Sequence, residues 1–479
     1  MANNPADFGS IPVLSGRKKI VLDFEEVTDK NVVDIIEASK PLHDANRHDI
    51  EYLYNYYKGI QPILGKTREY QQEINNIVVE NRASQIVNFK EGQLMRKPIQ
   101  FVSAENADNA DQVKILNNLM RLCRKHQADK RIIKWMLIGG IGYRFAMATD
   151  PKYSWQTILD TRALDPRDTE SIYSSGFGKP LLMTYTHRKR NENGMEKDEY
   201  RVYTESVSYH IIDGKIVEKN TFFTNGINPI IPYELNDERI GCFEWVINLL
   251  DNINEVQSGR LDSLAQFINS LLLFHNVDVE NDDIKRLREL NAIVFGDRSA
   301  DMTGEIKYLT SELNQSQVQT LVNYMWQAVL EIVGMPNRNG GSSTSDTGAA
   351  VVNRDGWSDS EQRAADAEEQ YPISESDFLV IVCEVLQLMN VHLDPTEVNT
   401  KFTRRIYENQ QSKAQTLTTM LGSEKIAPRL AFVASDMWSD PEEAWKESEK
   451  WYNEHKLDNN PTTTMEVIDE EKTDTGNGE

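Results

Sequence analysis

The clearest hydrophobic pattern in the chain lies between residues 317 and 333. Apolar side chains recur there at spacings of three and four, which places them on one face of an α-helix. They are Val318, Leu321, Val322, Met325, Val329, Leu330 and Val333. Gly334 and Pro336 follow, and a glycine end followed by a proline is typical of a helix stop. We therefore expect a helix that ends close to residue 334.

The next segment has no apolar side chain until Ala349, so it has nothing to bury and is predicted to be a loop. An apolar pattern then resumes and continues to Asn390. It contains a single proline, Pro372, whose ring and missing N–H would kink a helix. The region predicts helix, polar loop and long kinked helix, which suits a mechanical part better than a catalytic pocket.

The N-terminal third predicts further helices. Thr28 is expected to cap a helix that Pro41 breaks, and a tyrosine-rich helical patch ends at Gly59. Residues 74–95 and 111–138 also have helical patterns.

From residue 143 to residue 233 the pattern changes to short alternating runs punctuated by glycines, which indicates strands and turns. Residues 242–272 form a long amphipathic pattern again. Extended runs at 271–279, 292–295 and 304–309 follow, with a short helix expected to start at Asp282. The predicted fold class is mainly α with an inserted β-rich part, an α+β protein.

Composition limits the function classes. Lys and Arg number 52 against 75 Asp and Glu, a net charge of −23, whereas proteins that read nucleic-acid sequence normally present a basic face. The three widely spaced cysteines predict buried, reduced thiols rather than disulfides or a zinc site. No run of about 18 apolar residues and no secretion signal is present.

The candidate chemistry is weak. Gly65-Lys66-Thr67 suggests a phosphate-binding loop, but the required first glycine would fall at position 60, which is Ile60. The glycines at 139–142 lack the third glycine of a dinucleotide fingerprint and predict a tight turn. The histidines show no metal-ligand spacing. We expect no catalytic residue, metal or cofactor.

Short motifs spread over residues 45–455 resemble the portal proteins of tailed double-stranded-DNA bacteriophages, in the branch typical of long-tailed phages. The similar segments, in the family's order, are Tyr56-Tyr57-Lys58-Gly59, residues 75–99, Gly139 to Tyr143, Asn228 to Tyr233, Glu244 to Asp251 and Gly304 to Leu309.

The resemblance implies a ring subunit with wing, stem, clip and crown. The implied parts are an N-terminal arm at 1–27, a wing at 28–241 with its β-rich part at 143–233, stem helices at 242–272 and 312–335, a clip at 273–311, a tunnel loop at 336–348, a long kinked helix at 349–395, a crown at 396–457 and a disordered acidic tail at 458–479.

The resemblance also implies partners. These are further copies of the chain, twelve in the family's rings, double-stranded DNA in the channel, the terminase large subunit, a head-completion or adaptor protein, and the major capsid and scaffolding proteins. It implies a place at one vertex of the virion capsid after assembly in the host cytoplasm. No membrane is expected.

The site residues follow from these parts. The DNA-facing residues would be Asn337, Arg338, Asn339, Ser342, Ser343, Thr344 and Arg354, among which the two arginines are the best candidates for phosphate contact. Partner contacts on the clip would involve Asp282, Lys285, Arg286, Arg288 and Arg298. Two alternatives stay open: a monomeric helical adaptor, and an NTPase that uses Lys66.

Overall fold

The structure is a computed structural model with two compact units, residues 1–406 and residues 407–479, which are described separately. It describes residues 14–68, 73–104, 109–152, 157–178, 180–192, 194–268, 271–275, 292–295, 305–309, 315–337, 357–402, 410–435, 437–438 and 441–456.

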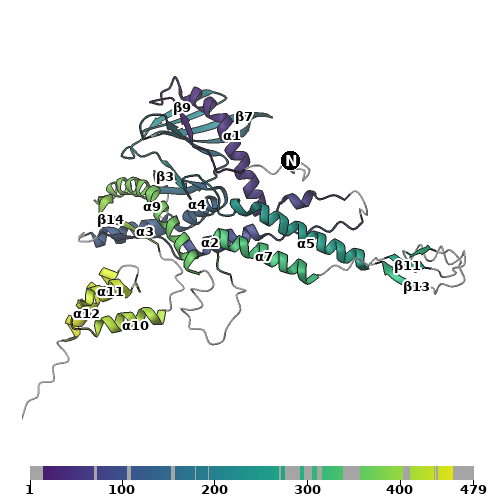
Figure 1. The fold of residues 1–479 in the computed structure, drawn as a ribbon. Coiled ribbons are helices and arrows are strands. Elements are labelled where there is room, and N and C mark those ends of the chain that lie inside the picture. The colour runs from purple at the N-terminus through teal and green to yellow at the C-terminus, as the bar shows by residue number, and fades with distance from the viewer. Residues whose placement is uncertain are drawn as a thin grey trace, which may run out of the picture. The chain divides into compact units, whose positions relative to one another are not determined.

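The first unit begins with strand β1 (Ile20–Leu22) and the long helix α1 (Val32–Tyr57), which continues through Pro41 (Figure 1). The prediction that Pro41 breaks this helix is wrong. Buried residues on both sides of the proline, from Ile35 to Leu53, anchor the helix against the unit, and that packing outweighs the lost backbone hydrogen bond. The tyrosine-rich patch does end the helix, and Gly59 follows with a φ of 89°.

Three helices follow, with a difference from the predicted boundaries. They are α2 (Arg82–Leu94), α3 (Ala110–Leu122) and α4 (Lys125–Gly139), with the short helix η2 (Pro62–Gly65) before them and strand β2 (Gln100–Ser103) between. Arg124 has a left-handed backbone, with a φ of 58°, and divides the predicted helix 111–138 in two. Residues 74–81 have no regular secondary structure, so the predicted helix begins only at Arg82.

The glycine turn at 139–142 joins α4 to the β-rich part, as predicted. Gly140 caps α4 with a φ of 78°, and a Cβ there would lie 2.0 Å from the carbonyl oxygen of Arg239. Strand β3 starts at Ile141. Only glycine fits this turn, because both the positive φ and the close approach exclude a side chain.

The β-rich part forms two antiparallel arrangements. Its strands are β3 (Ile141–Ala148), β4 (Leu159–Leu164), β5 (Thr169–Ser174), β6 (Leu181–Glu192), β7 (Met195–Tyr203), β8 (Val207–Ile212), β9 (Lys215–Thr221) and β10 (Ile230–Glu234). The order in one sheet is β1-β5-β6-β7-β8-β9, with β1 parallel to β5, and in the other β10-β3-β4. The predicted β-rich block is confirmed.

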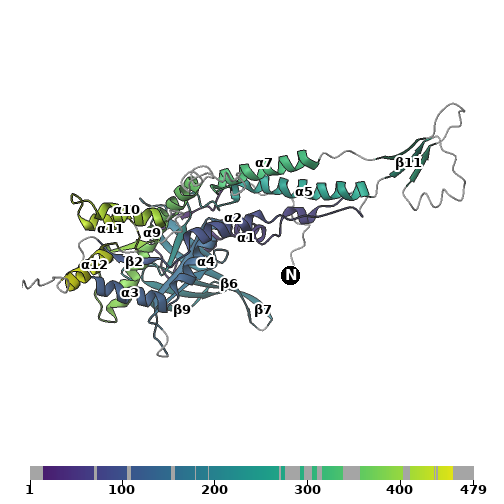
Figure 2. The same cartoon turned by 90° about the horizontal axis from the view of Figure 1, so that it is seen from below.

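Two long helices and a small sheet follow. After the turn η3 (Glu244–Val246), helix α5 (Ile247–Ile268) lies beside α7 (Gln315–Val333), as Figures 1 and 2 both show. Between them in the chain, β11 (Leu271–His275) pairs in parallel with β12 (Ala292–Phe295) and antiparallel with β13 (Glu305–Leu309). The helix expected to start at Asp282 lies outside the described residues.

Helix α7 ends at Val333, and Gly334 follows with a φ of 65°, which confirms the predicted stop. The C-terminal half of its apolar face is buried: Val329, Leu330 and Val333 belong to the main core. Leu321, near the other end, is 50% exposed.

The long helix α9 (Trp357–Gln387) contains Pro372. Its second half supplies Phe378, Leu379 and Val382 to the main core. The turn η4 (Pro395–Glu397) leads to β14 (Val398–Lys401), which pairs antiparallel with β2. The first unit therefore includes both α9 and β14, and the second unit begins at Tyr407.

The second unit contains α10 (Gln410–Leu421), α11 (Pro428–Ser435) and α12 (Pro441–Lys456). Phe432 stacks on Trp438 with ring centroids 4.8 Å apart and meets Trp445 edge-on at 5.7 Å. Trp451, also on α12, is 60% exposed and does not pack inside this unit to the same extent.

Candidate functional site

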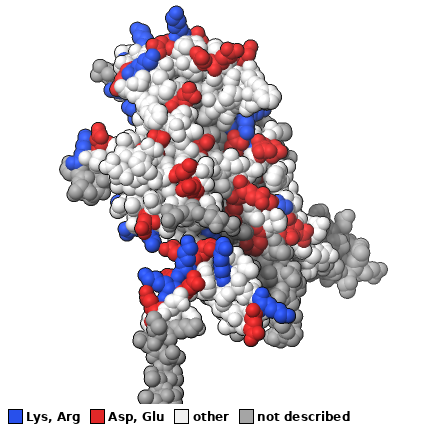
Figure 3. All heavy atoms as spheres, turned by 90° about the vertical axis from the view of Figure 1, so that its left-hand side faces the viewer, with Lys and Arg blue, Asp and Glu red and all other residues white. Residues whose placement is uncertain are grey.

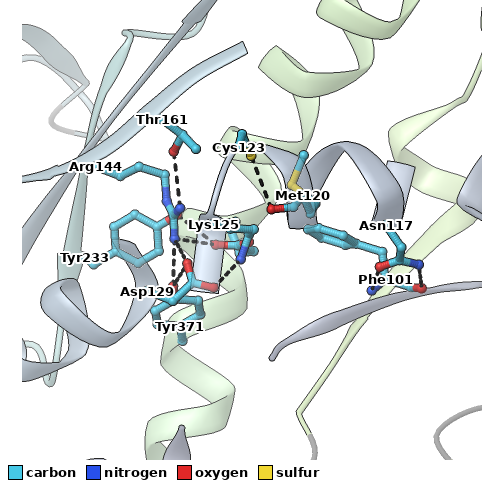
Figure 4. A network of polar contacts seen from close by, with 11 residues as sticks. Phe101, Asn117, Met120, Cys123, Lys125, Asp129, Arg144, Thr161, Tyr233 and Tyr371 are labelled. Carbon is cyan, nitrogen blue, oxygen red and sulfur yellow. Dashed lines mark hydrogen bonds and ion pairs between the residues drawn. The ribbon is translucent and has the colours of Figure 1, made fainter. Parts of the chain in front are cut away.

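The long helix α9 is fixed to the first unit by a buried polar cluster next to Pro372. Its members are Lys125 and Asp129 of α4, Arg144 of β3, Tyr233 of β10, and Tyr371 and Glu375 of α9. Figure 4 labels all of them except Glu375. We call these six residues the joint. The four charged side chains are at most 2% exposed.

Arg144 is the centre of the joint. Its Nε donates to the Tyr233 hydroxyl at 2.8 Å, and its Nη2 donates to the Tyr371 hydroxyl at 2.8 Å. The same nitrogen donates to Asp129 and lies 3.5 Å from Oε2 of Glu375. One guanidinium therefore connects β3 to α4, β10 and α9, which is possible because its planar head carries five donors.

Lys125 contacts both acidic residues of the joint. Its Nζ lies 2.8 Å from Oδ2 of Asp129 and 2.7 Å from Oε1 of Glu375. The second contact is an ion pair without hydrogen-bond geometry. Tyr233 in turn donates to Oε2 of Glu375 at 2.8 Å. Both acids and both bases thus have opposite charges as neighbours, and the joint is neutral.

Burial and charge act in opposite directions on these groups. Burial alone would raise the pKa of Asp129, but Lys125 and Arg144 outweigh it, and the pKa lies below its usual value. Burial raises the pKa values of Tyr233 and Tyr371 well above the ordinary range, so both remain neutral donors. Asp129 is therefore held ionised beside its two basic neighbours, and the two tyrosines keep their hydroxyl protons.

Further side-chain hydrogen bonds lie just after the proline. Ser374 donates to the carbonyl oxygen of Pro232 in β10 at 2.7 Å. Within α9, Ser376 donates back to the carbonyl oxygen of Pro372 at 2.8 Å. Because the joint residues Tyr371 and Glu375 flank Pro372, the proline lies within the part of α9 that the joint attaches.

A second polar system connects α5 to the chain before α2. The backbone N–H groups of Asn76, Val78 and Glu80 donate to Asp262 (2.6 Å), Ser258 (3.0 Å) and Asn254 (2.8 Å). We call residues 76–80 the brace. Two residues of extended chain span about 6.6 Å and one helical turn of four residues about 6 Å, so the two periods match.

Asp262 connects the brace to the segment after η2. Its buried carboxylate lies 2.7 Å from Nζ of Lys66 and 3.6 Å from Nε of Arg68. Lys66 follows a 3-10 turn, whereas a phosphate-binding lysine follows a glycine loop between a strand and a helix. The geometry at Lys66 therefore gives no support to the NTPase alternative.

Near the N-terminal end of α5, Asp251 accepts a hydrogen bond from the hydroxyl group of Tyr56 at 2.8 Å. Its second oxygen, Oδ2, is buried without a hydrogen bond within the described part of the chain. Burial raises the pKa of Asp251 to about 6, although the bond from Tyr56 opposes the rise.

The helices α5 and α7 leave apolar side chains on the surface. On α7, Leu321, Tyr324 and Ile332 are 50%, 71% and 40% exposed. We call these three residues the α7 stripe. Leu321 and Ile332 lie beside the buried face of the helix and Tyr324 lies roughly opposite to it, while Asn323 and Gln327 are exposed polar residues on the other flank. Arg260 of α5 fixes the helix pair through Gln315 and Gln319, both at 2.6 Å.

Most of the predicted site residues lie outside the described residues. This applies to Arg338, Asn339, Ser342, Ser343, Thr344 and Arg354 of the polar loop, and to Asp282, Lys285, Arg286, Arg288 and Arg298 between β11 and β13. Asn337 is described and follows Pro336 after α7, partly buried. Pro372 lies within α9, beside the joint.

Sequence reasoning missed both the joint and the brace. The joint unites residues from four segments far apart in the chain, so no local motif encodes it. The one local signal is the pair Lys125 and Asp129, which lie four residues apart in a predicted helix. The apolar residues near 77–79 predict a helix, so the sequence gives no sign of the brace.

The surface and the thiols fit the composition. On the face shown in Figure 3, basic side chains are scattered among acidic ones and form no continuous patch. The described residues contain no cluster of His, Cys, Asp and Glu suited to a metal ion, and none of the described helices could span a membrane. Burial raises the pKa of Cys123 to about 11 and those of Cys242 and Cys383 to about 12, so these thiols are poor nucleophiles.

Comparison with known proteins now decides the family. Residues 37–460 match the family described as "Phage portal protein, SPP1 Gp6-like". The chain belongs to this portal protein family. The match includes both helices beside the small sheet, the joint and most of the second unit.

No curated protein sequence matches the chain. Among solved structures, the fold is similar to a chain of "Neck of empty GTA particle computed with C6 symmetry". The identity is 12%, the alignment covers 74% of this portal protein and 89% of that chain, and the TM-score is 0.39.

The joint yields a stability prediction. Glu375→Gln leaves the buried cluster with an excess positive charge, and it should lower the free energy of unfolding by about 3 kcal/mol or more. Chemical denaturation followed by circular dichroism measures this loss. Glu196→Gln, at an ion pair whose two side chains are 64% and 65% exposed, is the control and should change little. Equal effects of the two substitutions would contradict the role of the joint.

Asp251 yields a pH prediction. Its folded pKa of about 6 lies above the ordinary aspartate value of 3.8, so between these two pH values the folded state binds a proton that the unfolded chain does not. Stability should therefore fall as pH rises from about 4 to about 6. Asp251→Asn keeps the acceptor for Tyr56 and should remove this fall, gaining about 1–2 kcal/mol at pH 7 after allowance for solvent screening. Urea titrations of the wild-type protein and of Asp251→Asn at pH 4.5 and pH 7 test this prediction. An equal change in the free energy of unfolding between the two pH values in both proteins would refute it.

Proposed function

We propose that this portal protein forms a ring at one vertex of a phage capsid, and that DNA passes through the ring during packaging and ejection. The observation that carries the proposal is the family match over residues 37–460. In this proposal α5 and α7 are stem helices, the β11–β13 sheet belongs to the clip, and α10–α12 belong to the crown.

The surface of the stem helices supports assembly. The α7 stripe exposes large apolar side chains, and Leu261 and Leu264 on α5 are 43% and 48% exposed. Exposed apolar groups along one pair of helices are typical of surfaces that another chain covers. Both helices are held from within by Arg260 and by the brace, so they would present these groups as fixed surfaces.

The charge supports a conduit rather than a DNA-gripping protein. A chain with net charge −23 assembled into a ring gives a strongly acidic channel wall, which repels phosphates and lets DNA slide. In the proposal, residues 336–348 form the tunnel loop, and Arg338 and Arg354 supply weak, sequence-blind phosphate contacts.

The partners belong to the proposal as well. The clip would bind the terminase large subunit during packaging and a head-completion or adaptor protein afterwards, and capsid and scaffolding proteins would contact the rest. ATP would be hydrolysed by the terminase, so the portal protein itself is not an enzyme and needs no cofactor.

Ring formation is the first test. Negative-stain electron microscopy of the purified protein, with its mass in solution, should show rings with a central hole. Leu321→Glu should abolish the rings and leave the subunit folded, because Leu321 is already 50% exposed. Asn323→Glu on the polar side of α7 is the matched control. A strict monomer at high concentration would instead favour a helical adaptor.

Nucleotide binding is the second test. Equilibrium dialysis with radiolabelled ATP should find no stoichiometric binding to the wild-type protein, because the Lys66 ammonium group forms an ion pair with Asp262. Lys66→Met should loosen the segment after η2 without changing that result. Saturable binding that this substitution abolishes would restore the NTPase alternative.

A further inference from the structure

A cavity of about 200 Å³ lies where five parts of the first unit meet. Its walls come from α2, the end of α4, residues 235–245, the end of α7 and the first half of α9. Leu94, Leu137 and Val333 make the walls largely apolar. Trp245, which is 57% exposed, lies at the surface of the lining. The cavity is thus apolar inside and reachable from outside.

Two cations line this cavity without an acidic partner. Lys90 is half-buried and Arg363 is exposed, and neither makes a hydrogen bond or ion pair within the part of the chain that the structure describes. This contrasts with Lys125 in the joint, which contacts two carboxylates. Asp366, also on the lining, accepts a hydrogen bond from Gln362 at 3.3 Å.

The surroundings make the charge on Lys90 costly. Burial lowers the pKa of Lys90, and the nearby Arg363 lowers it further. Cys242 beside it opposes this fall only in part, and burial raises the pKa of its own thiol to about 12. A lysine in such a place gains most from a carboxylate that enters the cavity.

Arg363 is held where it can share that carboxylate. Its side chain crosses the turn after α7 so closely that a Cβ on Gly334 would lie 2.2 Å from Cδ of Arg363. Gly334 therefore makes room for the arginine stem. The ligand that fits is a carboxylate on a short apolar stem, which describes a glutamate or aspartate side chain.

A second copy of the chain is the best source of this group. The chain carries 75 acidic residues against 52 basic ones, so another copy offers an excess of carboxylates. The cavity also adjoins the exposed apolar surface of the stem, because Val333 lines it and Ile332 of the α7 stripe is 40% exposed.

We propose that this cavity is a socket between subunits, which receives an acidic side chain of a neighbouring copy on Lys90 and Arg363. The inference rests on the proposed ring. It gives the ring a specific contact at the end of α7 and the first half of α9, the two helices that flank the polar loop.

The substitution Lys90→Met tests the socket because it keeps the apolar stem and removes the charge. In isolated subunits, separated by gel filtration, it should leave the melting temperature unchanged or raised, since an unpaired charge is removed. In rings it should weaken the subunit contact roughly tenfold or more, measured as the concentration at which rings dissociate. Lys130→Met, on an exposed lysine of α4, is the matched control.

A cross-link identifies the partner group. Rings assembled from a mixture of light and ¹⁵N-labelled subunits should, after treatment with a water-soluble carbodiimide, give amide links between Lys90 of one label and an acidic residue of the other. Wild-type rings whose dissociation is unchanged by Lys90→Met would overturn the socket and leave the proposed ring intact.

A different source of the anion would also overturn it. In that case sodium acetate or inorganic phosphate would stabilise the isolated wild-type subunit saturably, Lys90→Met would abolish the effect, and ring dissociation would not change. Failure of the wild-type protein to form any ring would remove both the socket and the proposed function.

Discussion

The fold depends on a neutral cluster of two acids and two bases buried among tyrosines. A single charge in such a place would cost several kcal/mol, and removal of any one partner exposes the others to that cost. The joint therefore specifies one arrangement of α4, β3, β10 and α9, because only that arrangement brings Asp129, Arg144 and Glu375 together. Apolar packing of α9 alone would permit small shifts along the helix, whereas the joint does not.

The joint and the brace fix different helices. The joint holds α9 next to Pro372, and the brace holds α5 along one face through Asn254, Ser258 and Asp262. The polar loop therefore connects two helices with fixed positions, α7 through its core residues and α9 through the joint.

Periodicity was enough to predict the helices and strands that bury a regular face. The end of α7 at Gly334, the β-rich block and the strand at 292–295 were all predicted from local patterns. Local patterns failed where tertiary contacts decide. Pro41 is accommodated because α1 is anchored on both sides, and residues 76–80 do not form a helix because their N–H groups find acceptors on α5. The joint and the cavity have no local signal, because their residues meet only in the fold.

The most direct measurement is hydrogen exchange of the α9 amides, read by mass spectrometry with overlapping peptides. The account predicts that residues 373–386, which include Glu375 of the joint and the core residues from Phe378 to Leu386, exchange only by global unfolding. Residues 357–370, attached by fewer buried groups, should exchange faster. Glu375→Gln should make the exchange rates of the two halves of α9 similar. One uniform rate along α9 in the wild-type protein, unchanged by Glu375→Gln, would contradict the claim that the joint fixes this helix.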